Sequence, residues 1–144
     1  GFRELAVALR AAEQGSSGLL KLRDASLAYF SFARANPALY QLMFGPELGS
    51  EDMPAEYREA RDEAFGELKR IIAEILNQRI DSPEVRRAAL AGWSYTHGLA
   101  SLVIHGVLQL TSSTSDSRFV DSTLRGFEHL FKAGEGDEAQ RGVQ

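Results

Sequence analysis

The stretch Gly92–Gly106, "GWSYTHGLASLVIHG", decides the fold class of this chain. It contains the single tryptophan of the sequence and two of its three histidines. It lies in a longer run, residues 88–115, that has no aspartate, glutamate, lysine or arginine. Residues of one helical face recur at steps of three and four: Trp93, His97, Ala100 and Ile104. Apolar residues also fill the adjacent faces, so we expect a helix that is covered on most sides.

The sequence outside this stretch is divided into further helices by capping residues, glycines and prolines. Ser82 before Pro83 is typical of a helix start, because serine caps a helix and proline fits its first turn. Asn36 before Pro37 repeats the pattern, and the pair Gly45-Pro46 stops the short helix that follows. Helical spacing between these stops predicts helices over residues 2–12, 17–35, 37–44, 54–79, 83–105 and 116–133.

These features predict an all-α domain, a bundle of about five or six helices over residues 1–133. No strand pattern or internal repeat is present in the sequence. Residues 134–144 are polar and rich in glycine, so we expect a disordered tail. The chain begins without methionine and already in a helical pattern. We therefore expect it to be a fragment whose upstream part has been removed or was not recorded.

Composition excludes several classes of function. The sequence has no cysteine, which excludes disulfides and thiolate nucleophiles. Its net charge is −4, and its basic residues are scattered among acids, which argues against nucleic-acid binding by this chain. The uncharged run 88–115 contains polar and aromatic residues and does not fit a membrane span. We expect a cytoplasmic protein with no cofactor, no metal and no membrane partner.

The helix over residues 83–105 has more apolar surface than a small chain is expected to bury alone. One face can pack into the domain core, and a second copy of the chain is the economical cover for another. Gly92 and Gly98 each cost about 1 kcal/mol in a helix interior relative to alanine. Their presence indicates close approach to another helix or room for a ligand.

His97 shares a helical face with Trp93 and is expected to point inward. One interpretation is a core histidine whose ring nitrogens bond to neighbouring backbone or hydroxyl groups. Another is direct contact with a ligand, since the surrounding aromatic residues suit a mostly apolar pocket. Catalysis or metal binding would need a paired acid or a second ligand, and the sequence nominates neither. His105 lies near the helix end, where its charge is favourable to the negative pole of the helix.

Two motifs resemble a known family. "LAYFSFARANPALYQLMFG", residues 27–45, resembles the helix pair of the C-terminal domains of tetracycline-repressor-like (TetR-family) transcription regulators. "WSYTHGLASLVIHG", residues 93–106, resembles the Trp–His–Gly signature of one subgroup, which carries over to Trp93, His97 and Gly98. The similarity covers residues 2–133. It implies a bacterial repressor-type regulator that contacts operator DNA only through an N-terminal helix-turn-helix domain absent from this chain.

The resemblance further implies a homodimer that pairs through its last two helices, and a small apolar effector. The residues that this places at the dimer interface are Gly92, Thr96, Leu99, Val103, Val120, Leu124, Phe127 and Phe131. The candidate ligand-binding residues are Tyr29, Ala33, Phe44, Phe65, Leu68, Trp93, His97 and Ser101.

Three hypotheses of function follow. The first is a sensor and dimerisation domain of a regulator, in which an effector shifts the spacing of the absent DNA-binding heads. The second is a helical dimerisation module with no ligand pocket. The third is a small enzyme that uses His97 or His105 as a base. It requires a carboxylate or hydroxyl within hydrogen-bond reach of that ring and a polar, solvent-open cleft. We expect no catalytic residues, because the sequence offers no such partner.

Overall fold

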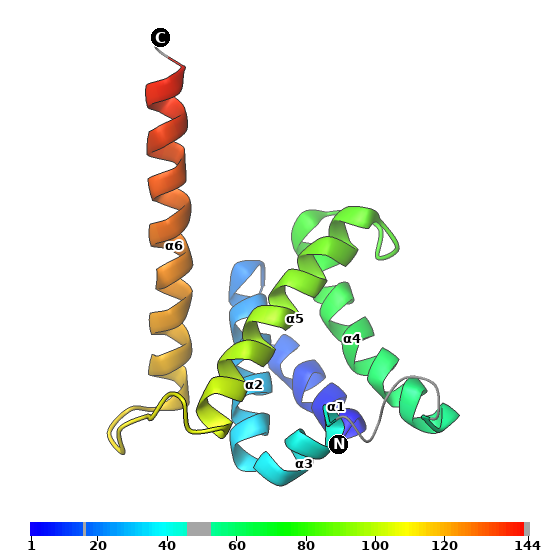
Figure 1. Ribbon diagram of the computed structural model, residues 1–144. Helices are drawn as coiled ribbons and strands as arrows, with labels where there is room; N and C mark the ends of the chain where they lie inside the picture. The colour runs from blue at the N-terminus through cyan, green and yellow to red at the C-terminus, as the bar shows by residue number, and fades with distance from the viewer. Residues whose placement is uncertain (16, 46–52, 143–144) are drawn as a thin grey trace. The chain divides into compact units, whose positions relative to one another are not determined.

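The computed structural model describes residues 1–15, 17–45 and 53–142, and every regular element in these ranges is a helix. The predicted all-α bundle is therefore confirmed. The chain divides into two units, Gly1–Leu110 and Thr111–Gln144, and each is described by itself. The helices are α1 (Phe2–Glu13), α2 (Leu19–Ala35), α3 (Pro37–Met43), α4 (Ala55–Leu76) and α5 (Pro83–Ile104) in the first unit, and α6 (Asp116–Arg141) in the second (Figure 1).

The predicted helix starts differ in how their polar residues are used. Ser82 caps α5 as expected, and its Oγ accepts a hydrogen bond from the Val85 N–H at 3.3 Å. Asn36 stands at the start of α3, but its side chain does not cap that helix. Its Nδ2 donates instead to the Phe32 carbonyl at 3.0 Å, which lies in the last turn of α2 and also accepts from the Asn36 backbone N–H at 3.1 Å. One asparagine thus closes the preceding helix, while Pro37 opens the next.

Three helix ends differ from the expected ones. The short helix α3 stops at Met43, and Pro46 of the expected stop lies outside the described residues. The long helix α4 stops at Leu76 because Asn77 takes a left-handed conformation, which asparagine tolerates better than most residues. The last helix continues past Ala133 to Arg141, whereas a disordered tail was expected from residue 134. Alanine, glutamate and arginine in that segment favour helix and offset its glycines.

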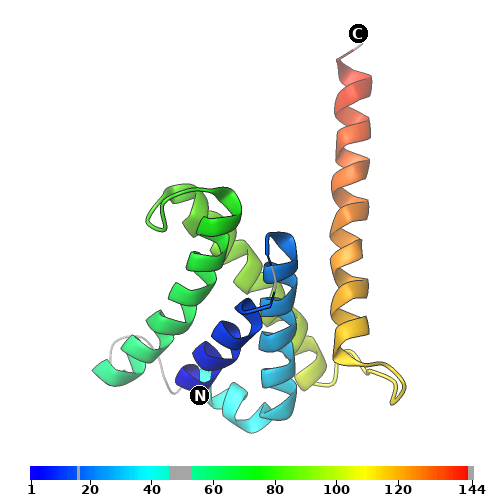
Figure 2. The same ribbon diagram turned by 180° about the vertical axis from the view of Figure 1, so that it is seen from behind.

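The core of the first unit lies among its four long helices. α1 lies between α2 and α4, and α5 packs across α2 and α4 (Figures 1 and 2). Leu5 and Leu9, which lie on one face of α1, are buried. Phe30 of α2, Ile71 of α4 and Val85 of α5 are completely covered. Within the described ranges, no helix combines the length and apolar character that a membrane span requires.

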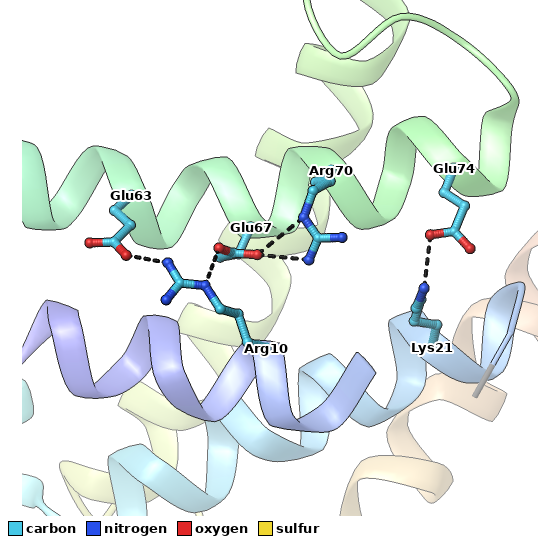
Figure 3. A network of polar contacts seen from close by, with 6 residues as sticks. All are labelled: Arg10, Lys21, Glu63, Glu67, Arg70 and Glu74. Atoms are coloured by element: carbon cyan, nitrogen blue, oxygen red, sulfur yellow. Dashed lines mark hydrogen bonds and ion pairs between the residues drawn. The ribbon is translucent and has the colours of Figure 1, made fainter. Parts of the chain in front are cut away.

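Ion pairs join α4 to α1 and, through Lys21 and Glu74, to α2 (Figure 3). The Arg10 guanidinium on α1 pairs with Glu63 and with Glu67, the latter at 2.5 Å from Nε to Oε1. Glu67 also accepts from Arg70 Nη2 at 2.8 Å, and its side chain is only 11% exposed. Burial raises the pKa of Glu67, but hydrogen bonds and charges from Arg70 and Arg10 outweigh burial, so the net pKa is lowered. Glu67 is thus held as a carboxylate between two arginines.

Replacing Glu67 with glutamine should lower the free energy of unfolding by about 1 kcal/mol at pH 7, because a shielded acceptor of two arginines loses its charge. The folded-state pKa lies below the unfolded value of about 4.3. The stabilisation is therefore present above that value and is lost as pH falls through the folded-state pKa. Urea unfolding at pH 7 and pH 3 measures both effects, with Glu59→Gln on an exposed part of α4 as the control. An equal loss at both pH values would contradict the prediction.

Candidate functional site

A partly open cavity of about 30 Å³ lies between the four long helices of the first unit. All four helices supply lining residues, two from α1, four from α2 and three each from α4 and α5, and none of the twelve is an acid, a lysine, an arginine or a histidine. Leu5 and Leu9 come from α1, Leu22 and Ala25 from α2. About 10–15 Å³ of such space holds one water molecule. A larger guest therefore requires the surrounding side chains or helices to move apart.

Trp93 forms one wall of this cavity. Its ring lies against Phe65 of α4, with centroids 4.8 Å apart and planes tilted by 31°. Its Nε1–H donates to the Tyr29 hydroxyl of α2 at 3.2 Å. The only tryptophan of the chain is thus held by one aromatic contact and one hydrogen bond at the position where α2, α4 and α5 meet.

A chain of hydrogen bonds runs from Trp93 to His97. The indole N–H can only donate, so the Tyr29 hydroxyl accepts from it. The Tyr29 and Tyr40 hydroxyls lie 3.1 Å apart, and Tyr40 lies 2.5 Å from His97 Nδ1. Tyr29 also lies 3.1 Å from His97 Nδ1, so both phenols reach that nitrogen. The other ring nitrogen, Nε2, lies 3.5 Å from Ser101 Oγ.

The electrostatics of this cluster favour uncharged groups. Burial lowers the pKa of His97, and the charge of His105 lowers it further. Burial raises the pKa of both Tyr29 and Tyr40 above the usual value for a phenol. At neutral pH the cluster therefore consists of a neutral imidazole and two neutral phenols. These groups can form hydrogen bonds with an uncharged molecule. His97 is a weaker base, and Tyr29 and Tyr40 are weaker acids, than the free side chains.

His97 does not line the cavity but borders an outer groove between α3 and α5. The groove has a volume of about 530 Å³ and is lined by His97, Ser101 and His105 of α5 together with residues of α3. The hydroxyls and the open cleft required by the enzyme hypothesis are therefore present around His97. The direction of the pKa shifts disfavours general base catalysis by His97, because a buried imidazole with a lowered pKa is a weaker base. His105 Nδ1 lies 2.8 Å from the Ser101 carbonyl oxygen, at the helix end where its charge was expected to be favourable.

The candidate ligand-binding residues fall into three groups. Four of them line the cavity: Tyr29, Phe65, Leu68 and Trp93. Three line the outer groove: Phe44, His97 and Ser101. Ala33 is fully buried and lines neither space. Leu5, Leu9 and Ser26 also line the cavity and were not among the predicted ligand-binding residues, although the helical repeat places Leu5 and Leu9 on one face of the first helix.

The predicted interface residues of α5 lie mostly inside the first unit. Gly92 and Thr96 line the cavity, and Leu99 is only 8% exposed. A β-carbon on Gly92 or on Gly98 would meet no other side chain or neighbouring helix within 4 Å, so neither glycine permits close helix approach within the chain. The apolar surface that α5 leaves exposed is at Leu90 and Leu102, and Val103 is half-buried.

The predicted interface residues of α6 become more exposed along the helix. Val120 is buried, Leu124 and Phe127 are half-buried, and Phe131 is 69% exposed. Phe127 and Phe131 stack with ring centroids 6.1 Å apart. Contact of these residues with a second copy stays a prediction.

Acidification should destabilise the chain through His97. Its folded-state pKa is lower than the unfolded value of about 6.5, so the unfolded state binds more protons at mildly acidic pH. The free energy of unfolding should therefore fall as pH drops from 7.5 to 5.5. Asparagine at this position offers an acceptor in place of Nδ1 without titrating, so His97→Asn should flatten the dependence.

Urea unfolding of the natural chain and of His97→Asn at several pH values in this window measures the effect. His129→Asn, at an exposed position of α6, is the matched control. The prediction is wrong if the natural chain and His97→Asn lose the same stability on acidification.

The first unit is thus a helical bundle with a cavity between its helices that no charged residue lines. The family model described as tetracyclin repressor-like, C-terminal domain, matches residues 22–127, from α2 into α6. The chain therefore belongs to the family of tetracycline-repressor-like C-terminal domains. The comparison with curated proteins and the comparison with solved structures each gave no match. Membership of the Trp–His–Gly subgroup stays a prediction.

Proposed function

We propose that this chain is the ligand-sensing and homodimerisation domain of a TetR-like transcriptional regulator. The observation that carries the proposal is the cavity between α1, α2, α4 and α5, which has no charged residue in its lining. Ligand pockets in proteins are mostly apolar, with a few polar groups that orient the guest. A small, mostly apolar molecule is the effector that such a lining favours.

The contribution of α1 to the cavity supplies a mechanism. Leu5 and Leu9 form part of the wall, so a guest larger than one or two waters displaces α1 from its neighbours. In the proposed regulator, α1 leads to DNA-binding heads whose half-sites lie about 34 Å apart. A shift of α1 in both copies changes the spacing of the heads. The effector must bind the displaced state more tightly than the closed state, or the equilibrium does not move.

The ion pairs of Arg10 with Glu63 and Glu67 oppose this displacement, because they join α1 to α4 beside the cavity (Figure 3). The state with α1 packed in place and the state with α1 displaced therefore differ in electrostatic as well as apolar contacts. Such a balance allows a small ligand to shift the population of the two states.

Titration with cyclooctane, a compact apolar probe, tests the pocket. Trp93 gives the chain a single indole N–H resonance, which should shift when the probe enters the cavity. Gly92→Leu should weaken binding at least tenfold, because the new leucine side chain would occupy space in the cavity. A tenfold loss corresponds to about 1.4 kcal/mol of binding free energy. Gly98→Leu is the matched control, since Gly98 lies on the same helix, has equal room for a β-carbon and does not line the cavity.

Absence of a Trp93 response, or equal weakening by the two leucine variants, would overturn the proposed pocket. The first of these results would favour the alternative of a helical dimerisation module without a pocket. The small volume of the cavity is the observation that supports this alternative.

A further inference from the structure

Two hydroxyl groups meet in the wall of the cavity. Ser26 Oγ of α2 and Thr96 Oγ1 of α5 lie 3.3 Å apart. Both residues line the cavity, and Thr96 is only 5% exposed. They are 70 positions apart in the sequence, so only the packing of α2 against α5 brings them together.

The Ser26–Thr96 pair has one hydroxyl proton that its own hydrogen bond does not use. Two hydroxyls carry two protons, and the bond between them uses one. The other proton can be directed at a guest in the cavity. Tyr29 and Trp93, which also line the cavity, differ in this respect, because their protons serve the chain of bonds that leads to His97. The pair is therefore the donor in the cavity wall that a guest can engage without breaking that chain.

The rest of the lining determines which acceptor is suitable. No lysine, arginine or histidine faces the cavity, so a carboxylate would lose its hydration without gaining a counter-charge. A neutral carbonyl or ether oxygen needs only one donor and leaves the remaining surface of the guest for the apolar walls. The leucines of α1 and α2 supply those walls.

We infer that the cavity selects a neutral, mostly apolar molecule with a hydrogen-bond-accepting oxygen, such as a ketone or an ester, through the Ser26–Thr96 hydroxyl pair. This inference rests on the proposed function and adds the chemical class of the effector. The pair joins α2 to α5, so a bound oxygen is held where the two helices meet.

Three probes of similar size test the inference by calorimetry: cyclooctanone, cyclooctane and cyclooctanecarboxylate. The ratio of cyclooctanone to cyclooctane affinity should fall about tenfold in Thr96→Val, which keeps the shape but removes the hydroxyl. Ser26→Ala should lower the ratio similarly, whereas Thr96→Ser should preserve it. Ser94→Ala, on an exposed turn of α5 outside this cavity, is the matched control and should leave the ratio unchanged. Cyclooctanecarboxylate should bind at least tenfold more weakly than cyclooctanone.

The outcomes separate this inference from the proposed pocket. If cyclooctane and cyclooctanone both bind and the ratio is the same in Thr96→Val, the inference is wrong and the pocket stands. Binding of the carboxylate as tightly as the ketone also overturns the inference alone. If none of the probes binds the natural chain, the pocket and the inference fail together. Thermal unfolding of each variant shows whether a lower affinity ratio comes from a loss of folding. A ratio of cyclooctanone to cyclooctane affinity that is preserved in Thr96→Ser would support the hydroxyl as the group that binds the ketone.

Discussion

Phe131→Glu is expected to weaken self-association of the chain by roughly a thousandfold. The Phe131 side chain is 69% exposed and stacks on Phe127 of the same helix. Burying one such ring contributes about 2 kcal/mol. A two-fold interface contains the contact twice, so about 4 kcal/mol is lost, and each buried carboxylate adds a further penalty. Sedimentation equilibrium at micromolar concentration measures the change.

Ala133→Glu is the matched control for this experiment. It introduces the same charge on the same helix, and two residues along an α-helix place it on nearly the opposite face. It should leave the association constant within about twofold of the natural value. A natural chain that is monomeric at micromolar concentration would contradict the dimer, and equal effects of the two variants would contradict the proposed face of α6.

Tyr40→Ala is expected to lower the free energy of unfolding by about 3–5 kcal/mol, the usual cost of removing a buried aromatic side chain. Tyr40 is only 2% exposed, and its ring contacts Phe44 and Tyr29. Its hydroxyl also lies 2.5 Å from His97 Nδ1. Tyr40→Phe keeps the ring but removes this hydrogen bond, so we expect it to cost about 1–3 kcal/mol.

Urea unfolding of both variants separates packing from hydrogen bonding. Tyr57→Phe is the control, because Tyr57 also makes one hydroxyl hydrogen bond, to the Met43 carbonyl at 3.0 Å, but lies outside the cluster. Tyr40→Phe should in addition raise the pKa of His97 in the folded chain, because a neutral Nδ1 can accept a hydrogen bond from the Tyr40 hydroxyl and the protonated ring cannot. Histidine NMR titration detects this change. An unchanged histidine titration would show that the chain of hydrogen bonds does not hold His97 neutral.

Local features of the sequence were sufficient to predict the helices. Ser82 and Pro83 form a start signal that depends on neighbouring residues alone, and α5 begins there. The buried face of Leu5 and Leu9 follows from the helical repeat in the same way. Asn36 shows the limit of such signals, because its side chain was available to two helices and bonded to the preceding one. Local chemistry predicts that a cap residue is present, and the path of the chain decides which helix end it satisfies.

The site could be predicted only in part. Spacing placed Trp93 and His97 on one inward face, and both belong to the cluster that borders the cavity. Spacing also placed Thr96 on an adjacent face, which we assigned to a partner, whereas Thr96 faces Ser26 inside the chain. A helix turns by about 100° per residue, so two adjacent faces differ by only one residue step. Spacing alone therefore does not show which of the two faces meets another helix of the same chain.

The order of residues sets where helices begin, which of their faces are apolar, and that residues 88–115 hold no aspartate, glutamate, lysine or arginine. Which helix covers each face depends on how the helices pack, and this packing brings Ser26 to Thr96 and Tyr40 to His97. The physical reason is that apolar burial is non-directional: it requires each face to be covered but does not specify the neighbour. Hydrogen-bonded pairs between distant residues depend on that choice of neighbour, because their partners must come within about 3 Å.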